Sequence, residues 1–205
     1  DKGLETLKKY ASMFGLDETS GIEIFESEPH ISDMDPERSA IGQGTHAFAN
    51  VQLARYVTAL ANRGTVFDLS LLLKETDSKG NLVQEFAPKV HEQLDIAAST
   101  WDAVFEGMRG VVTRSARFQD LPVNIAGKTG TAQEVKTRGN HAFFISFAPY
   151  ENPEISVAVN IPNGYNSANA ALTAKSVYRY YYGYMSLDEI MSAGALNASR
   201  ETING

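Results

Sequence analysis

The sequence predicts an α+β fold in which helices pack on an antiparallel sheet. Three apolar stretches of strand length follow one another between positions 123 and 161, and the last is followed by a periodic stretch of helix length. Short connections favour antiparallel neighbours. The order strand, strand, strand, helix therefore favours a sheet with helices on it rather than a parallel α/β arrangement.

Composition limits what the chain can bind. It has 205 residues, is 43% hydrophobic and carries a formal net charge of -7. This is enough for one domain with a core, or for part of a larger domain. The acidic balance argues against nucleic acid as a partner, because phosphate binding needs a basic surface. Cysteine is absent, which excludes disulfides, thiolate metal sites and a cysteine nucleophile.

Apolar residues at helical spacing predict a helix at the start of the chain. The helix should span 4–14 and end at Gly15, because glycine favours helix C-termini. The segment 19–24 (TSGIEI) then alternates, which predicts a turn into a short strand. After a polar loop, Asn50 is expected to cap a second helix that ends at Gly64. Its buried stripe is expected to contain Val51, Ala54, Val57, Leu60 and Ala61.

A hairpin and a third helix are predicted for the middle of the chain. The stretches 69–74 and 82–86 flank a polar segment at 77–81 (DSKGN), which predicts a β-hairpin. Ser99 and Asp102 have the spacing of a capping box and predict the start of a helix. That helix is expected to bury Trp101, Val104, Phe105, Met108, Val111 and Val112.

The last third of the chain predicts two strands and a helix. The strands should cover 141–148 and 155–161, joined by a short link. The helix should begin near Asn166 or Ser167, and we assign Ser167 as its N-cap. Its buried face is expected to contain Ala171, Ala174, Val177, Tyr178 and Tyr181. Residues 185–205 show little periodicity, so we expect a domain over 1–184 and a C-terminal tail over 185–205.

The segment 127–133 (GKTGTAQ) is the candidate binding site. An apolar lead-in at 123–126 predicts that it belongs to a strand. Because alternate residues of a strand share a face, Thr129 and Thr131 should point one way and Lys128 the other. A glycine between the two threonines leaves room for a ligand near the backbone. Such a strand suits an anionic, peptide-like ligand, because its edge can pair with a ligand main chain and its hydroxyls can bind a carboxylate.

These residues lead to a family resemblance. Lys-Thr-Gly is a signature of penicillin-binding proteins and class A β-lactamases, and here it continues as Lys-Thr-Gly-Thr-Ala-Gln. The sequence resembles the transpeptidase domain of class B penicillin-binding proteins from about Leu4 to Tyr182. The turn at 42–44 (GQG), with the helix after it, and the segment at 140–144 (NHAFF) are also similar to that family. The resemblance implies part of the penicillin-binding protein/serine β-lactamase-like transpeptidase fold.

The resemblance also implies a function and residue roles. It implies a penicillin-binding D,D-transpeptidase that cross-links peptidoglycan through a serine acyl-enzyme. Lys128 would supply positive potential near the substrate carboxylate, and Thr129 and Thr131 would hydrogen-bond that carboxylate. The N–H of Thr131 would be an oxyanion donor, and a D-Ala-D-Ala stem peptide or β-lactam would lie along Gly130, Thr131, Ala132 and Gln133. No cofactor or metal is expected, and Gln43 is assigned a structural role.

The chain departs from the family at the nucleophile. No serine has lysine three positions later, and the single Ser-x-Asn sequence, Ser167-Ala168-Asn169, follows the Lys-Thr-Gly strand instead of preceding it. We therefore expect the nucleophilic serine in a missing N-terminal part of the same domain, and we expect the 205-residue portion alone to be inactive. The resemblance places the protein at the extracytoplasmic face of the bacterial cell membrane, anchored by a segment outside this chain.

Two other functions stay open at this point. A serine β-lactamase shares the fold and adds a base that hydrolyses the acyl-enzyme, while a β-lactam-sensing relative would bind without turnover. The Thr-Ala-Gln continuation favours the penicillin-binding protein, and the chain lacks a Glu-x-x-x-Asn pattern. The four histidines show no metal-ligand spacing, so a zinc site is not expected. We expect His141 to be a hydrogen-bonded structural residue rather than a base.

Overall fold

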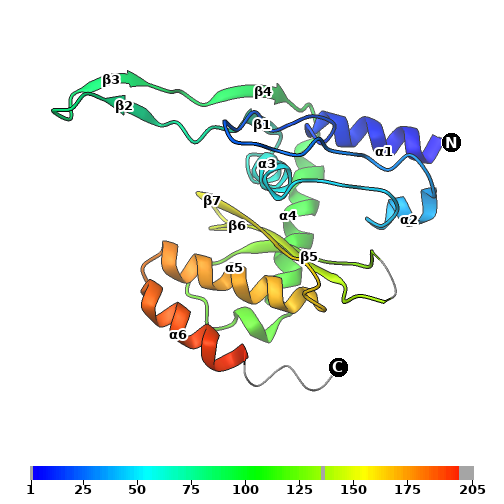
Figure 1. Cartoon of the computed structure of the whole chain (residues 1–205). Coiled ribbons are helices and arrows are strands. Elements are labelled where there is room, and N and C mark those ends of the chain that lie inside the picture. The colour runs from blue at the N-terminus through cyan, green and yellow to red at the C-terminus, as the bar shows by residue number, and fades with distance from the viewer. Residues whose placement is uncertain (1, 135–136, 199–205) are drawn as a thin grey trace.

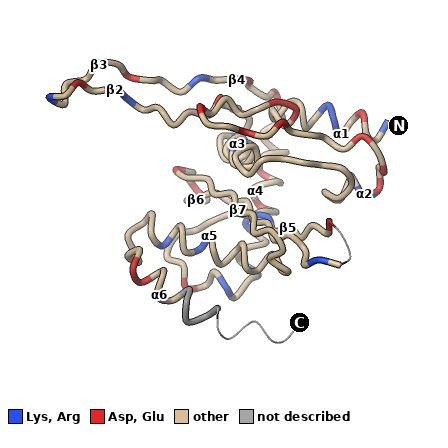
Figure 2. Tube along the Cα trace, in the orientation of Figure 1, with Lys and Arg blue, Asp and Glu red and all other residues tan. Residues whose placement is uncertain are grey.

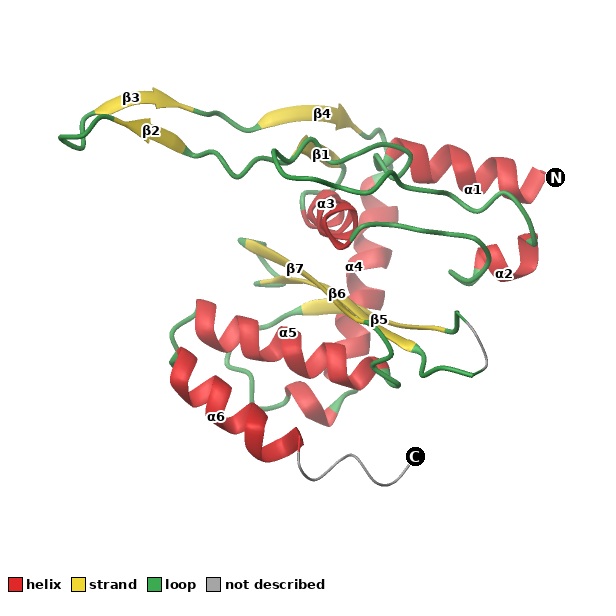
Figure 3. Cartoon of the chain, in the orientation of Figure 1, coloured by secondary structure: helices red, strands yellow, loops and turns green. Residues whose placement is uncertain are grey.

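The fold is built on a small antiparallel sheet with helices on both faces and a long two-stranded arm (Figures 1 and 3). The computed structural model describes residues 2–134 and 137–198. The sheet contains β5 (Ala126–Ala132), β6 (His141–Ala148) and β7 (Ile155–Ile161) in the order β5-β6-β7. Both pairings are antiparallel, and the second and third strands have the bounds expected from the sequence.

Helices cover the two faces of the sheet and create two cores. The helix α5 (Ser167–Tyr181) lies on one face, and α3 (Asn50–Ala61) and α4 (Ala98–Thr113) lie on the other (Figure 1). The side chains of alternate β6 residues point into opposite cores, because successive residues of a strand face opposite sides of the sheet. Phe144 belongs to the cluster on the α5 side and Phe147 to the cluster with α3 and α4, and both are fully buried.

The first predicted helix is confirmed, whereas the strand after it is not formed. The helix α1 (Lys2–Met13) is followed by Gly15, whose φ of 69° needs glycine. Residues 19–24 form no strand. The carbonyl of Thr19 accepts a hydrogen bond from Arg55, and the N–H and hydroxyl of Ser20 donate to a carboxylate. Side chains satisfy this backbone, so it needs no neighbouring strand.

The second helix begins one residue earlier than expected. A short helix, α2 (Pro36–Ala40), precedes it. Ala49 is the N-cap of α3, and its N–H donates to the Gln52 side chain, whereas Asn50 lies inside the helix and donates to Ala158 of β7. The prediction that Asn50 is the cap was therefore wrong. Of the expected stripe, Val57 and Leu60 are buried, whereas Val51, Ala54 and Ala61 are only partly buried.

A pair of two-stranded ribbons forms the arm that extends from the body (Figure 1). β1 (Thr65–Asp68) pairs with β4 (Lys89–Gln93), and β2 (Lys74–Thr76) pairs with β3 (Leu82–Glu85). The predicted hairpin is confirmed. Its first strand, β2, overlaps the expected range 69–74 only at Lys74, so that boundary was wrong. The backbone N–H groups of residues 71 and 72 donate to side chains instead of to a strand.

The third helix is confirmed, but its predicted capping box is not. The N-cap of α4 is Ala97, which makes no side-chain cap, so Ser99 lies inside the helix. Because the helix starts before Ser99, Asp102 lies too far along it to cap its N-terminus, and its carboxylate accepts from Arg63 at 2.7 Å. After α4 comes a short 3-10 helix, Ala116–Phe118. Trp101, Phe105, Met108 and Val112 are buried as expected, whereas Val104 and Val111 are partly buried.

The last long helix is confirmed with a different cap. Asn166 is the N-cap of α5 and its side chain accepts from Ala168, so the assignment of Ser167 as the cap was wrong. Ala171, Ala174 and Tyr178 are buried as expected, whereas Val177 and Tyr181 are 38% and 51% exposed. The helix α6 (Leu187–Ala198) follows within the segment expected to be a tail. The domain boundary near 184 stays a prediction.

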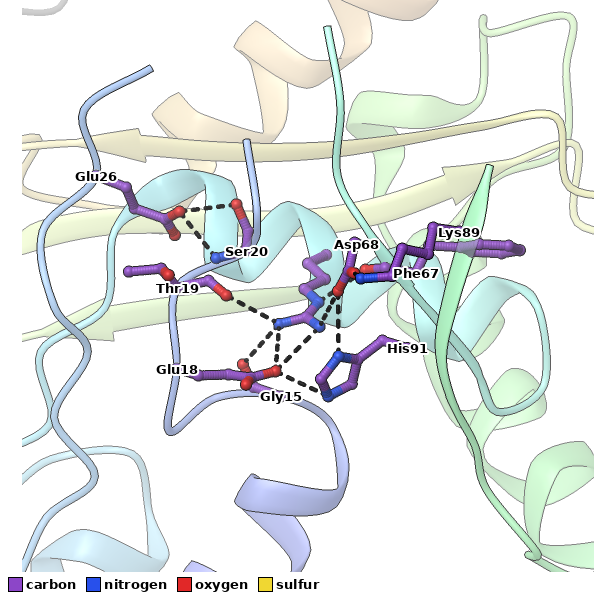
Figure 4. Close-up of polar contacts among 10 residues, drawn as sticks. Gly15, Glu18, Thr19, Ser20, Glu26, Phe67, Asp68, Lys89 and His91 are labelled. Carbon is purple, nitrogen blue, oxygen red and sulfur yellow. Dashed lines mark hydrogen bonds and ion pairs between the residues drawn. The ribbon is translucent and has the colours of Figure 1, made fainter. Parts of the chain in front are cut away.

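A buried charge cluster fixes the turn after α1 to the arm (Figure 4). The Arg55 side chain is 1% exposed and contacts Glu18 at 3.2 Å and Asp68 at 3.3 Å. His91 lies 2.8 Å from Glu18 through Nε2 and 3.1 Å from Asp68 through Nδ1. A hydrogen bond from Lys89 lowers the pKa of the Asp68 carboxyl.

We expect Arg55→Met to destabilise the protein by about 3 kcal/mol, the scale for losing hydrogen bonds from a charged donor, while Glu18 and Asp68, which are 45% and 23% exposed, stay partly hydrated. The change also removes hydrogen bonds to the carbonyls of Gly15, Thr19 and Phe67. The measurement is urea unfolding of the full-length protein at pH 7. The matched control is Arg38→Met, because Arg38 is 74% exposed. Its loss should cost less than about 1 kcal/mol. Equal losses for the two variants would contradict this assignment.

Candidate functional site

The candidate site lies on a strand with one free side. Within the described residues, β5 has a single neighbour, β6. The carbonyl of Thr129 accepts from Lys128 Nζ at 2.5 Å, and the carbonyl of Thr131 accepts from Gln43 Nε2 at 3.3 Å. Neither donor belongs to β6, so both carbonyls point away from the sheet. We call the outward side of β5 from Lys128 to Ala132 the peptide-binding edge, after the role that the sequence predicts for it.

The register of the sheet confirms how the site residues divide between the faces. Lys128 pairs with Ile145, and Thr129 pairs with Phe144. Because directly opposed residues share a face, Lys128 lies on the α3 and α4 side and both threonines on the α5 side. Lys128 and Thr131 are exposed, and Thr129 is half-buried. Ala132 ends the strand, and Gln133 is exposed just beyond it.

Lys128 is the one charged residue among those that form the three strands of the sheet. Neither β6 nor β7 contains Asp, Glu, Lys or Arg, and Figure 2 therefore draws both strands in tan. Among the ion pairs of the described residues, none involves this ammonium group. Its positive charge is therefore available to an anionic ligand at the peptide-binding edge.

Contacts at its first residues hold β5 in place. The predicted lead-in at 123–126 joins the strand only at Ala126. Before that residue, Arg109 of α4 donates to the Ile125 carbonyl at 2.9 Å and to the Asn124 side chain at 2.6 Å. The N–H of Tyr150 donates to the Asn124 carbonyl at 2.8 Å. These bonds replace strand pairing and fix where the peptide-binding edge begins.

Two glycines of the motif have different neighbours. A Cβ on Gly127 would lie 2.4 Å from Cζ of the buried Phe144 ring, so no side chain fits there. Sequence reasoning missed this requirement, because the ring comes from another strand. A Cβ on Gly130 would lie 3.3 Å from Cβ of Phe143. The expected role of Gly130 in admitting a ligand stays a prediction.

A small hollow adjoins the threonine face of β5. It has a volume of about 90 Å³ and is lined by Thr129, Ser115, Arg117 and the first residues of α5. The N-terminus of a helix favours negative charge, as does an arginine side chain. A larger hollow of about 410 Å³ lies beside Arg63 and Tyr150, and no residue from 127 to 133 lines it. Of these two hollows, the smaller one is therefore the one that a residue of the motif, Thr129, lines.

His141 makes the contacts expected of a hydrogen-bonded structural residue. His141 accepts from the N–H of Asn163 through Nδ1 and lies 3.2 Å from Glu134 through Nε2. It is hydrogen-bonded on both sides, as expected for a structural residue. Across residues 2–134 and 137–198, no group of three or more His, Asp or Glu side chains is arranged to hold a metal ion.

Within the described residues, β5 is thus an edge strand that carries one cation and has two threonine hydroxyls on the α5 side. Residues 1–181 match the family described as the penicillin binding protein transpeptidase domain. The chain therefore belongs to the penicillin-binding protein transpeptidase family.

Curated relatives support the same family. The peptidoglycan D,D-transpeptidase MrdA of Haemophilus influenzae is 29% identical over 217 residues, which cover 87% of this chain and 33% of that protein. MrdA of Escherichia coli K12 is 27% identical over 201 residues, covering 80% of this chain and 31% of the relative. The chain thus spans about a third of the length of the relatives it matches.

Solved structures confirm the expected fold class. Penicillin-binding protein 2B of Streptococcus pneumoniae superposes with a TM-score of 0.76 and 25% identity, covering 90% of this chain and 33% of that one. Penicillin-binding protein A of Mycobacterium tuberculosis, solved as an imipenem acyl-enzyme complex, has a TM-score of 0.74 and 25% identity. That match covers 83% of this chain and 40% of the other.

Gly127→Ala should destabilise the protein by about 2 kcal/mol, a typical cost of forcing an extra methyl group into a packed core. The methyl group would collide with the Phe144 ring beneath β5. Thermal and urea unfolding measure the change. Gly107→Ala on α4 is the control, because open space surrounds its Cβ position and alanine favours helix. A variant at 127 as stable as the control would contradict the packing argument.

Proposed function

We propose that the protein containing this chain is a penicillin-binding D,D-transpeptidase that cross-links peptidoglycan. In this proposal, β5 is one side of its substrate-binding site. The observation that carries the proposal is the free edge of β5, which presents Lys128 together with Thr129 and Thr131. Membership of the transpeptidase family and the D,D-transpeptidases among its relatives support it.

The substrate in this proposal is the D-Ala-D-Ala end of a peptidoglycan stem peptide. Its main chain would add to the peptide-binding edge as a further antiparallel strand from Gly130 to Gln133. Its terminal carboxylate would accept hydrogen bonds from the hydroxyls of Thr129 and Thr131, within the field of the Lys128 ammonium. A β-lactam carries a carboxylate and an amide at comparable places and would occupy the same site.

The chemistry needs a serine from another part of the protein. Its hydroxyl oxygen would attack the carbonyl carbon of the penultimate D-Ala, and the tetrahedral oxyanion would accept from the N–H of Thr131. Collapse would expel the terminal D-Ala, with a proton on its amine, and leave a serine ester. An amine of a second stem peptide would then displace the serine and form the cross-link. During these reaction steps Lys128 would position the substrate carboxylate and would take part in the proton transfers of the site.

The location follows from the proposed substrate. Peptidoglycan precursors are joined outside the cytoplasm, so the protein would act at the extracytoplasmic face of the bacterial membrane. No helix of the described part of the chain is both long and apolar enough to cross a membrane. We propose that an anchor and the remaining part of the domain, with its serine, belong to sequence outside this chain.

The lifetime of the acyl-enzyme separates this proposal from a serine β-lactamase. A transpeptidase lacks a base for hydrolysis of the ester, so the full-length protein should keep a fluorescent penicillin bound for hours. A hydrolase would release it quickly and turn over many equivalents. Gel fluorescence after removal of free label measures the lifetime, and rapid loss of label would favour the β-lactamase.

Lys128→Ala should slow acylation of the full-length protein by labelled penicillin at least about 100-fold, the scale measured for loss of one preorganised electrostatic group at a reaction site. The physical reason is the loss of the cation nearest the expected ligand carboxylate. Lys79→Ala at the exposed hairpin turn is the matched control and should acylate at the unchanged rate. Equal rates for the 128 variant and the unaltered protein would remove Lys128 from the site.

A further inference from the structure

A buried group of hydroxyls fixes the turn that precedes α3. Ser32 and Ser39 are 0% and 2% exposed, and their hydroxyls are 2.6 Å apart. The N–H of Thr45 donates to Ser32 Oγ at 3.1 Å. Gly44 has a φ of 85°, and a Cβ there would lie 2.7 Å from both serine hydroxyls. The backbone around position 43 is therefore held in one place rather than free to move.

This turn directs one side chain to the peptide-binding edge. The backbone N–H of Gln43 donates to the Arg38 carbonyl at 2.9 Å, which orients the residue. Its side-chain Nε2 donates to the carbonyl of Thr131 at 3.3 Å, across 88 positions of sequence. The contact is exposed and long, so it is weak and exchangeable. The role is thus more specific than the structural one expected from the sequence.

The carbonyl that Gln43 contacts is one that an added strand needs. A peptide that lies antiparallel to β5 donates its own N–H groups to outward carbonyls of the edge. Thr131 presents such a carbonyl, and the Gln43 carboxamide already donates to it. A carbonyl oxygen can accept two hydrogen bonds, but an added strand would approach this one from the outward side that the carboxamide already occupies, so we take the two to compete. A ligand with an N–H at this point replaces the hydrogen bond from Gln43 with its own. A ligand without such an N–H forms no hydrogen bond to this carbonyl.

We propose that Gln43 is a specificity-determining residue that occupies the Thr131 carbonyl in the free protein and yields it to ligands that donate an N–H there. The inference rests on the proposed penicillin-binding function. Removing the competing donor favours ligands with that N–H and leaves other ligands unaffected. The preference between two β-lactams is therefore the quantity that reports on Gln43, because a general effect on folding or on the serine changes both rates alike.

The test compares acylation of the full-length protein by benzylpenicillin and by imipenem. Benzylpenicillin has an acylamino N–H on the atom bonded to the reactive ring, whereas imipenem has a carbon atom at that point and its hydroxyl lies one bond further from the ring. Gln43→Met keeps the side-chain length and removes the donor. We expect the second-order rate constant for benzylpenicillin to rise about fivefold, the range for a single exposed hydrogen bond. The rate constant for imipenem should stay the same, so the ratio of the two also rises about fivefold.

A control variant at another glutamine separates an effect of Gln43 from a general effect of the substitution, and the possible outcomes separate this inference from the proposed function. Gln84→Met changes an exposed glutamine on the arm and should leave both rates and their ratio unchanged. Gln43→Asn, too short to reach Thr131, should shift the ratio as Gln43→Met does. An unchanged ratio, or a fall in the benzylpenicillin rate, overturns the inference while the proposed function stands. If neither β-lactam acylates the unaltered protein, the proposed function fails and the inference fails with it.

Discussion

The free edge of β5 is the feature on which the candidate site depends. Unpaired strand edges attract other chains, so proteins shield or charge them. Here Lys128 and Gln43 donate to two outward carbonyls, which satisfies these acceptors without adding a strand. The Gln43 bond is long and exposed, so it is the weaker of the two. Side chains rather than another strand therefore protect this edge.

That edge can stay open because the rest of β5 is held firmly. On one side the strand pairs with β6 along its whole length. Underneath, Gly127 lies directly on the Phe144 ring, and at the start Arg109 holds the Ile125 carbonyl. Fixed geometry lowers the conformational entropy that the protein itself must lose when a ligand binds. The packing residues therefore serve the site even though they do not touch a ligand.

Periodic patterns in the sequence predicted the elements, and tertiary contacts decided their ends. The strands at 141–148 and 155–161 were readable because apolar residues fill both faces of a sheet that is buried on both sides. Caps were predicted poorly, since Asn50 and Ser99 lie inside their helices. Small polar residues suit caps, turns and long-range bonds equally well. Their partners, such as Ala158 of β7 for Asn50, are not visible in local sequence.

The candidate site, too, could be predicted from the sequence only where its residues are neighbours in the chain. The residues from Lys128 to Thr131 could be recognised because they are adjacent, and strand geometry alone divides them between two faces. Gln43 could not, because its contact depends on how two distant turns and β5 meet in the fold. The sheet adds a further property that no motif describes. Since β6 and β7 contain no Asp, Glu, Lys or Arg, no charge on these two strands offsets the positive charge of Lys128.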